Sequence, residues 1–252
     1  MIRVGLIGFG KAGQAVARVL EEAPDISLQW IARRSVSGSP EHGPDGAAAG
    51  RCPVLALQAD TIDALMPVLP VDALIDFSSA CALPMYGEAV RTHRLMLVSA
   101  ISAYAPADIA YLAGLGQVTR VMSSPNITLG INFLILAARL LRGVAPFADI
   151  EIIEQHFREK PEMSGTARKI AESLQVENTR ITSLRLGGIV GQHEVIFGFP
   201  HQTVRLTHDS IRREAFGTGA VFALNALAQC PPGHYSFDDL LLQKVRQDLR
   251  NI

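Results

Sequence analysis

The sequence predicts an α/β protein in which a doubly wound parallel sheet is followed by a smaller α+β domain with an open mixed or antiparallel sheet. Three observations lead to this prediction. An apolar run over residues 2–7 ends in a glycine-rich turn and is followed by apolar residues at helical spacing. Apolar runs then alternate with helical patterns as far as residue 122, which is typical of parallel sheets. Beyond residue 126, three strand patterns follow one another with only turns between them.

The first half of the chain is expected to form six strands with helices between most of them. The strands are expected at 2–7, 26–32, 54–57, 73–77, 95–99 and 118–122. The helices are expected between the glycine turn and Pro24 and at 61–68, 83–92 and 107–114. The segment 33–51 is rich in Ser, Gly, Pro and Ala, so we expect a loop there.

The residues after Asn126 predict a different arrangement. We expect an apolar helix at 131–142, a strand at 149–156 and a helix from Ser164 to about Leu174. Strand patterns at 181–186, 194–199 and 204–209 are separated by turns, which favours antiparallel pairing among them. Helical patterns at 215–227 and 237–249 follow.

Composition argues against several classes of protein. The 252 residues are 48% apolar and 19% charged, which suits a sizeable core and argues against disorder. The formal net charge of −1 argues against a nucleic-acid binder. No uncharged apolar run reaches about 18 residues, so we expect no membrane span. The sequence runs from Met1 straight into a strand without a secretory signal, so we expect a cytoplasmic protein. The three cysteines and the acidic and histidine residues lack metal-ligand spacing, so we expect reduced thiols and no metal.

The glycine turn predicts a dinucleotide site and hence a Rossmann domain. Gly8, Gly10 and Gly13 form the pattern G-x-G-x-x-G between a strand and a helix. The first glycine permits a tight turn, the second lets the backbone approach a pyrophosphate, and the third lets helix and strand pack closely. Lys11 lies within the turn and could approach the phosphates or point to water. A purely structural glycine turn is the alternative interpretation.

The end of the second strand favours NADPH over NADH. An acidic residue at this point usually binds the ribose hydroxyls of NAD. Here the strand ends in Arg33-Arg34-Ser35, and guanidinium groups suit a 2′-phosphate. Two solvated arginines at the start of a loop are the alternative, and use of NADH is left open.

A strand ending in His156 predicts a second site. Lys160 follows four residues later, and Ser164-Gly165-Thr166 opens the next helix with backbone N–H groups and two hydroxyls, which suits a carboxylate. His156 and Lys160 could share proton donation and anion binding. An exposed, non-functional pair is the alternative. His193 begins a later strand, and we expect a structural or interface role for it.

Five segments, in order along most of the chain, resemble signatures of the 4-hydroxy-tetrahydrodipicolinate reductases (dihydrodipicolinate reductases) of lysine and diaminopimelate biosynthesis. They are Asp76 to Ser78, which resembles D-F-[ST]; Ser124 to Asn132, which resembles A-x-N-[FM]-S-x-G-[VI]-N; Glu154 to Ala167, which resembles E-x-H-H-x-x-K-x-D-x-P-S-G-T-A; Arg185 to Val195, which resembles R-x-G-x-x-x-G-x-H-x-V; and Phe216 to Ala220, which resembles F-A-x-G-A.

This resemblance implies a reductase that passes hydride from NADPH or NADH to a cyclic imine with two carboxylates. His156 would occupy the proton-donor position, Lys160 would bind substrate and support the protonated intermediate, and Ser164, Gly165 and Thr166 would grip a carboxylate. Residues 1–126 with 215–252 would bind the dinucleotide. Residues 127–214 would bind substrate, swing to close the cleft and assemble a homotetramer. Further cofactor-binding positions are expected at Ala12, Phe77, Ser78, Ser99, Ala100, Ser102 and Asn126.

The departures from the family pattern fall on the expected site. Phe157 stands where the family has a second histidine, the stretch between Lys160 and Ser164 is one residue short, and Ser99 to Ser102 replaces the loop G-T-T-G. An apolar wall at Phe157 would suit a less charged substrate, because it cannot satisfy a carboxylate. Three hypotheses therefore stand: the lysine-pathway reductase, a paralogous imine or amino-acid dehydrogenase with another substrate, and a non-catalytic NADP-binding regulatory protein.

Overall fold

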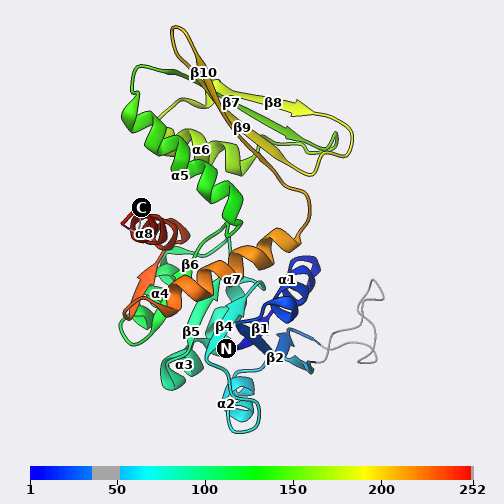
Figure 1. Ribbon diagram of the computed structural model, residues 1–252. Coiled ribbons are helices and arrows are strands. Elements are labelled where there is room, and N and C mark those ends of the chain that lie inside the picture. Colours follow the sequence, from blue (N-terminus) through cyan, green and yellow to red (C-terminus); the bar gives the residue numbers. More distant parts are fainter. Residues whose placement is uncertain (36–51, 251–252) are drawn as a thin grey trace. The chain divides into compact units, whose positions relative to one another are not determined.

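The computed structural model describes residues 1–35 and 52–250. Most of the loop expected at 33–51 therefore lies outside the described residues. The chain divides into two compact units, the first comprising Met1–Thr128 with Phe216–Ile252 and the second comprising Leu129–Ala215 (Figure 1). These boundaries lie within two residues of the division that the resemblance implied.

The first unit is built on a parallel sheet of seven strands. Its order is β11-β6-β5-β4-β1-β2-β3, and every neighbouring pair is parallel. The order reverses direction at β1, as in a doubly wound Rossmann sheet, so the prediction of this fold class is confirmed. The strands are β1 (Ile2–Ile7), β2 (Ile26–Arg33), β3 (Val54–Ala56), β4 (Ala73–Asp76), β5 (Met96–Ser99), β6 (Arg120–Ser123) and β11 (Gly233–Tyr235).

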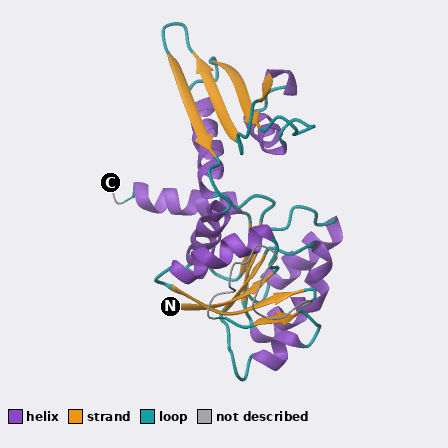
Figure 2. Cartoon of the chain, turned by 90° about the vertical axis from the view of Figure 1, so that its right-hand side faces the viewer, coloured by secondary structure: helices purple, strands orange, loops and turns teal. Residues whose placement is uncertain are grey.

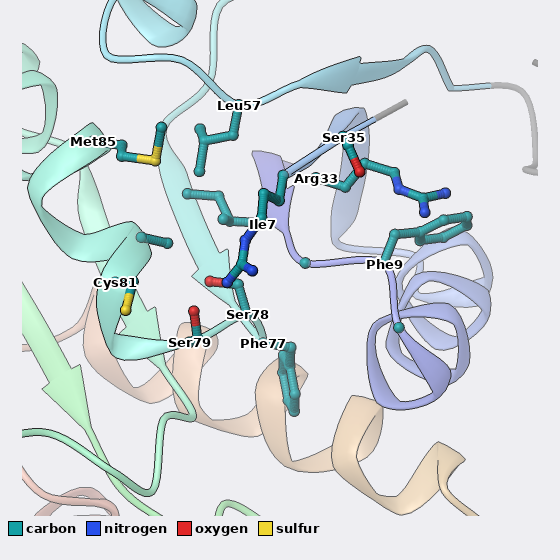
Figure 3. A pocket seen from close by; sticks show the side chains of 14 residues that line it. Ile7, Phe9, Arg33, Ser35, Leu57, Phe77, Ser78, Ser79, Cys81 and Met85 are labelled. Atoms are coloured by element: carbon teal, nitrogen blue, oxygen red, sulfur yellow. The ribbon is translucent and has the colours of Figure 1, made fainter. Parts of the chain in front are cut away.

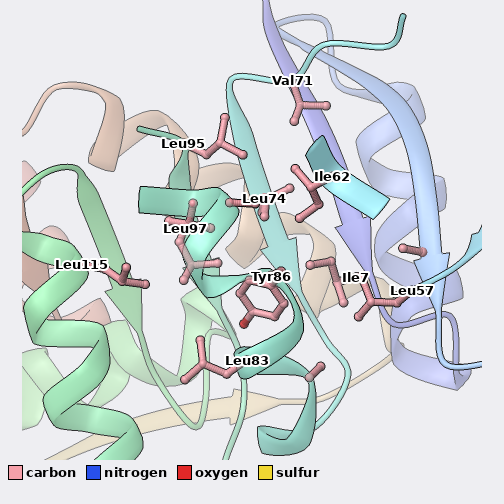
Figure 4. Packing of buried hydrophobic residues seen from close by; sticks show 14 of the residues in the cluster. Ile7, Leu57, Ile62, Val71, Leu74, Leu83, Tyr86, Leu95, Leu97 and Leu115 are labelled. Atoms are coloured by element: carbon pink, nitrogen blue, oxygen red, sulfur yellow. The ribbon is translucent and has the colours of Figure 1, made fainter. Parts of the chain in front are cut away.

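Helices lie on both sides of this sheet (Figure 2). The helices of the unit are α1 (Lys11–Glu22), α2 (Thr61–Leu65), α3 (Leu83–His93), α4 (Pro106–Gly116), α7 (Glu214–Ala228) and α8 (Phe237–Leu249). A buried cluster joins α2, α3 and α4 to one face of the sheet, with the ring of Tyr86 among the aliphatic side chains (Figure 4). The helices α1 and α7 meet where Gly217 of α7 lies against Val19, since a Cβ there would come within 2.5 Å of the Val19 side chain.

Strand β11 was not predicted from the sequence. It has three residues, one of them glycine, so it is too short to show a periodic pattern. It forms because β6 offers an open edge, where the Gly233 N–H donates to the Thr119 carbonyl at 3.0 Å. The edge also holds His234, whose ring joins the Ser123 hydroxyl at 2.8 Å.

The second unit contains a mixed sheet of four strands in the order β10-β9-β7-β8. Its elements are α5 (Leu129–Val144), β7 (Asp149–His156), α6 (Gly165–Leu174), β8 (Ile181–Arg185), β9 (Gln192–Gly198) and β10 (Thr203–Asp209). Antiparallel pairing was predicted for the last three strands, and it holds for β9 with β10. It is wrong for β8, which pairs in parallel with β7. The reason is the helix α6, which carries the chain across between β7 and β8 as in a βαβ unit.

The core of the second unit lies between this sheet and the helices α5 and α6. Ile152 of β7 and Val195 of β9 are paired in register and fully buried. Ile170 of α6 and Ile135 of α5 belong to the same buried cluster. This core ends toward the carboxyl end of β7, where polar side chains replace apolar ones on the buried face. In the described part of the chain no helix is long and apolar enough to cross a membrane.

Candidate active site

The buried side chains of β7 change from apolar to polar along the strand. Successive side chains of a strand alternate between its faces, and in β7 the buried positions are Ile150, Ile152, Glu154 and His156. The first two pack in the core, whereas the last two are a carboxylate and an imidazole. In the sheet register, Glu154 lies opposite His193 of β9, and His193 lies opposite His208 of β10. The sheet therefore carries a row of polar side chains at the end of its core.

Glu154 is the buried carboxylate of this row. Its side chain is 0% exposed, and Arg185 of β8 binds both of its oxygens, with Nη2 donating to Oε1 at 2.8 Å and Nη1 to Oε2 at 3.0 Å. The ring Nδ1 of His156 also bonds Oε2, and the Ser164 N–H donates to Oε1 at 3.3 Å. Burial alone raises the pKa of Glu154, but these hydrogen bonds and one from Ser183 outweigh it and lower the pKa to about 2. Glu154 is thus a carboxylate at neutral pH.

His193 is buried beside His156. Its Nε2 and the Ser164 hydroxyl are joined at 2.8 Å, and its ring stands edge-on to that of His156 with centroids 5.3 Å apart. Burial, assisted by the nearby charge of His156, lowers the pKa of His193 to about 4. His193 is therefore neutral at physiological pH. The expected structural role is consistent with these contacts, which also tie His193 to the Ser164 position expected to bind substrate.

The start of α6 presents unused hydrogen-bond donors. Ser164 caps the helix by accepting from the Ala167 N–H at 3.4 Å. Within the described part of the chain, the N–H groups of Gly165 and Thr166 have no acceptor. Two free N–H groups at the positive end of a helix, beside a hydroxyl, can bind a carboxylate.

The loop after β7 carries Phe157 and Lys160. Both backbone polar groups of Lys160 are hydrogen-bonded, because its N–H donates to the Phe157 carbonyl at 3.1 Å and its carbonyl accepts from Arg185 Nε at 2.9 Å. The Lys160 side chain is half-buried, and Phe157 is 41% exposed. The structure thus brings His156 and Ser164 together around Glu154, with Lys160 on the loop that Arg185 anchors.

Two of the three glycines in the turn of the first unit are required by the backbone around them. Gly8 has a φ of +94°, and a Cβ there would come within 2.6 Å of the Phe77 backbone. A Cβ on Gly13 would lie 2.1 Å from the Gly8 carbonyl oxygen. A Cβ on Gly10 would meet nothing within 4 Å, and Gly10 begins α1 without a side-chain cap. Gly8 and Gly13 are therefore required by the protein itself, whereas the space at Gly10 and the first N–H groups of α1 remain available to an anion.

A cavity of about 430 Å³ opens beside this turn (Figure 3). Its walls come from the turn after β1, from Arg33, Arg34 and Ser35 at the end of β2, and from Phe77 to Ser79 after β4. Among the described residues that line it, none is acidic. Lys11 is exposed and lies outside the lining of this cavity.

A second cavity of about 340 Å³ holds most of the other expected cofactor positions. Those lining it are Ala12, Phe77, Ser78, Ala100, Ser102 and Asn126. Phe216 also lines it, with its ring centroid 6.2 Å from that of Phe77. Ser99 differs from this group, because it is fully buried and its hydroxyl is joined to that of Tyr104 at 2.8 Å.

A buried acid supports the segment between the two cavities. Asp76 is 0% exposed and accepts hydrogen bonds from the Tyr86 hydroxyl at 2.6 Å and from the Ser78 hydroxyl and N–H at 2.6 and 2.9 Å. Burial raises the pKa of Asp76, although these hydrogen bonds oppose the change. The network fixes the turn at Phe77 and Ser78, which borders both cavities.

Glu154, Arg185 and Asp76 were not predicted as site residues from the sequence. Glu154 precedes His156 by two residues on a strand, and this spacing is a signal that the two share a face. The partnership with Arg185 joins strands about thirty residues apart, and no local pattern reveals it.

The fold and these two groups of residues define a class of enzyme, the nicotinamide-dependent oxidoreductases. Residues 126–241 match the family model for the C-terminus of dihydrodipicolinate reductase. A 4-hydroxy-tetrahydrodipicolinate reductase of Anaeromyxobacter dehalogenans is 30% identical over 258 residues, covering 92% of this chain and 94% of that protein. The chain belongs to the 4-hydroxy-tetrahydrodipicolinate reductase family.

Two further similarities agree with this family. A 4-hydroxy-tetrahydrodipicolinate reductase of Myxococcus xanthus is 28% identical over 96% of this chain and 98% of its own length. The solved structure of a dipicolinate-bound dihydrodipicolinate reductase from Paenisporosarcina sp. TG-14 matches with a TM-score of 0.78 and 21% identity, covering 94% of this chain and 97% of that one. The second similarity supports the fold.

Proposed function

We propose that this protein is an NADPH-dependent reductase that transfers hydride to a cyclic imine dicarboxylate such as 4-hydroxy-tetrahydrodipicolinate, in the lysine and diaminopimelate pathway. The observation that carries the proposal is the cluster of His156, Glu154 and Ser164 at the start of α6, in a chain of this family. With it we propose a homotetrameric, cytoplasmic enzyme.

The second unit supplies the groups that act on the substrate. The free N–H groups of Gly165 and Thr166 and the nearby hydroxyls bind one carboxylate. Lys160 supplies a positive charge for the anionic substrate and for charge that develops during reduction. His156 donates the proton, and Glu154 accepts a hydrogen bond from its other ring nitrogen.

The first unit supplies the cofactor site. The bound nicotinamide provides a hydride, which is the chemistry that the protein side chains lack. The space at Gly10 and the uncapped start of α1 fit a pyrophosphate, and Gly8, Gly13 and Lys11 complete the turn around it. The second cavity, lined by Phe77, Ser78, Ala100, Ser102 and Asn126, fits the nicotinamide half. Buried Ser99 supports this cavity indirectly, through the hydrogen bond between its hydroxyl and that of Tyr104.

The preference for NADPH rests on Arg33 and Arg34, and their replacement tests it. In the Arg33→Ser/Arg34→Ser variant we expect KM for NADPH to rise about 10-fold to 100-fold, since a hydrogen bond to a charged group contributes about 1.5–3 kcal/mol. KM for NADH should change little, because NADH lacks the 2′-phosphate. Arg246→Ser, an exposed position on α8, is the control and should change neither constant. Equal changes for both cofactors would exclude a 2′-phosphate site at these arginines.

The function itself is tested by following NADPH oxidation at its absorbance with freshly generated 4-hydroxy-tetrahydrodipicolinate. We expect turnover at an ordinary enzymatic rate, on the order of 1–1000 per second. No turnover, with NADPH binding confirmed in the same preparation, would contradict the substrate assignment. Binding without oxidation of any imine would favour the regulatory protein that the sequence left open.

Phe157 favours a second candidate, a reductase of the same family that acts on a less charged cyclic imine. The side chain lies directly after His156 on the loop that Arg185 anchors, and it offers an apolar surface where the family pattern has an imidazole. A panel of cyclic imines with one or two carboxylates separates the candidates. A higher kcat/KM for a monocarboxylate would favour the second candidate.

A further inference from the structure

We propose that Glu154 is a positioning residue. Its carboxylate, which Arg185 binds, fixes the tautomer of His156 and also holds the N-terminus of α6 through the Ser164 N–H. This inference rests on the proposed function, because His156 acts there as the proton donor.

Both carboxylate oxygens of Glu154 accept hydrogen bonds, Oε2 from His156 and Oε1 from the start of α6, and Arg185 donates to each. Oε2 accepts from His156 Nδ1 and from Arg185, and Oε1 accepts from Arg185 and from the Ser164 N–H. An ionised carboxylate only accepts hydrogen bonds, so His156 Nδ1 must carry the hydrogen in this contact. Nε2 is then the ring nitrogen left to exchange a proton. A displacement of Glu154 would disturb the histidine and the carboxylate-binding turn at once.

A glycine lies beside Nε2, the other ring nitrogen of His156. A Cβ on Gly191 would lie 3.1 Å from His156 Nε2, which is closer than such contacts usually are. The glycine before β9 therefore leaves Nε2 unobstructed on that side. Glu154 and His156 meet because residues two apart on a strand share a face. Glu154 therefore orients the ring of His156 at Nδ1, and Gly191 avoids a side chain that would crowd Nε2.

The other polar groups near His156 do not accept a hydrogen bond from its Nδ1, which leaves Glu154 as the acceptor. Arg185 of β8 binds the same carboxylate, and the ring of His193 of β9 stands edge-on to His156, with His208 behind it on β10. Lys160 lies on the loop after β7, where its carbonyl accepts from Arg185. Arg185 and Lys160 are cations, which cannot accept a hydrogen bond from Nδ1. His193 is neutral at physiological pH and bonds Ser164 instead. Of the residues that the structure describes around this ring, Glu154 is the carboxylate within hydrogen-bond distance of it.

The test measures the tautomer of His156 in the protein alone, by ¹⁵N NMR of the histidine side chains at about pH 9, where an imidazole is ordinarily neutral. The variant His156→Gln assigns the resonance among the seven histidines. In the wild-type protein we expect His156 to carry its hydrogen on Nδ1. In Glu154→Gln we expect a mixture of tautomers, with kcat lowered about 100-fold or more, since a misdirected catalytic imidazole loses up to about 10⁴-fold.

Two further variants make the result specific. Glu151→Gln changes a carboxyl on the same strand but on the opposite face, where it bonds Thr182, so it should keep both the tautomer and kcat. Glu154→Asp keeps the negative charge and should retain more of the Nδ1–H tautomer than Glu154→Gln. A wild-type His156 with its hydrogen on Nε2 would overturn the proposal, whether or not any variant folds. The tautomer is measured without substrate, so a failed reductase assay would overturn the proposed function and leave this result standing.

Discussion

We expect the Lys160→Ala variant to lose about 100-fold to 1000-fold in kcat with 4-hydroxy-tetrahydrodipicolinate and NADPH. Removing a single group that stabilises developing charge costs an enzyme about this much. The loss should come from chemistry and not from unfolding, because the hydrogen bonds that the structure shows for this residue are made by its backbone. Its N–H bonds the Phe157 carbonyl and its carbonyl accepts from Arg185, and truncation of the side chain leaves both bonds intact.

Whether kcat or KM changes in Lys160→Ala distinguishes a charge that binds the substrate from one that stabilises the transition state. A charge that binds the substrate and the transition state equally well raises KM when it is removed and leaves kcat unchanged. A charge that acts mainly in the transition state lowers kcat. Lys169→Ala, on α6 but outside the cluster around Glu154, is the matched control and should change neither value. Unchanged kinetics in Lys160→Ala would remove Lys160 from the mechanism.

The fold could be predicted where the signal is local. The apolar runs and the glycine turn predicted the strands and helices of the first unit, because a parallel sheet buries nearly continuous apolar segments. Strand β11 and the parallel partner of β8 could not be predicted in this way. Both depend on a sheet edge that exists only after distant segments have come together.

The candidate site could also be predicted only where its signal is local. His156, Lys160 and Ser164 follow one another within nine residues, so their pattern is readable in the sequence. The cation that binds the carboxylate of this cluster is Arg185, which lies on another strand. Its partner Glu154 has no local pattern that distinguishes it from the other residues of β7. Asp76 shows the same limit, since the side chain that binds it, Tyr86, lies on a helix ten residues further along.

Arg185 should also matter for stability, which provides a test that needs no substrate. In Arg185→Met, the Glu154 carboxylate stays buried without its cation, and breaking a buried ion pair in this way typically costs about 3–5 kcal/mol in the free energy of unfolding. The matched control is Arg205→Met, which breaks the pair of Arg205 with Glu194 in the same sheet. That arginine is 57% exposed, so the loss should stay below about 1 kcal/mol. Urea unfolding at neutral pH measures both.

The pH dependence separates this ion pair from simple loss of packing. The pKa of Glu154 is about 2 in the folded protein against an ordinary 4.5, so its contribution is fully present above about pH 4.5 and is lost as the pH falls toward 2. A shift of this size corresponds to on the order of 3 kcal/mol. The difference between the wild-type protein and Arg185→Met should therefore shrink steadily through that range. A difference that stays constant with pH would mean that Arg185 stabilises the second unit through its packing, and that its charge on Glu154 contributes little.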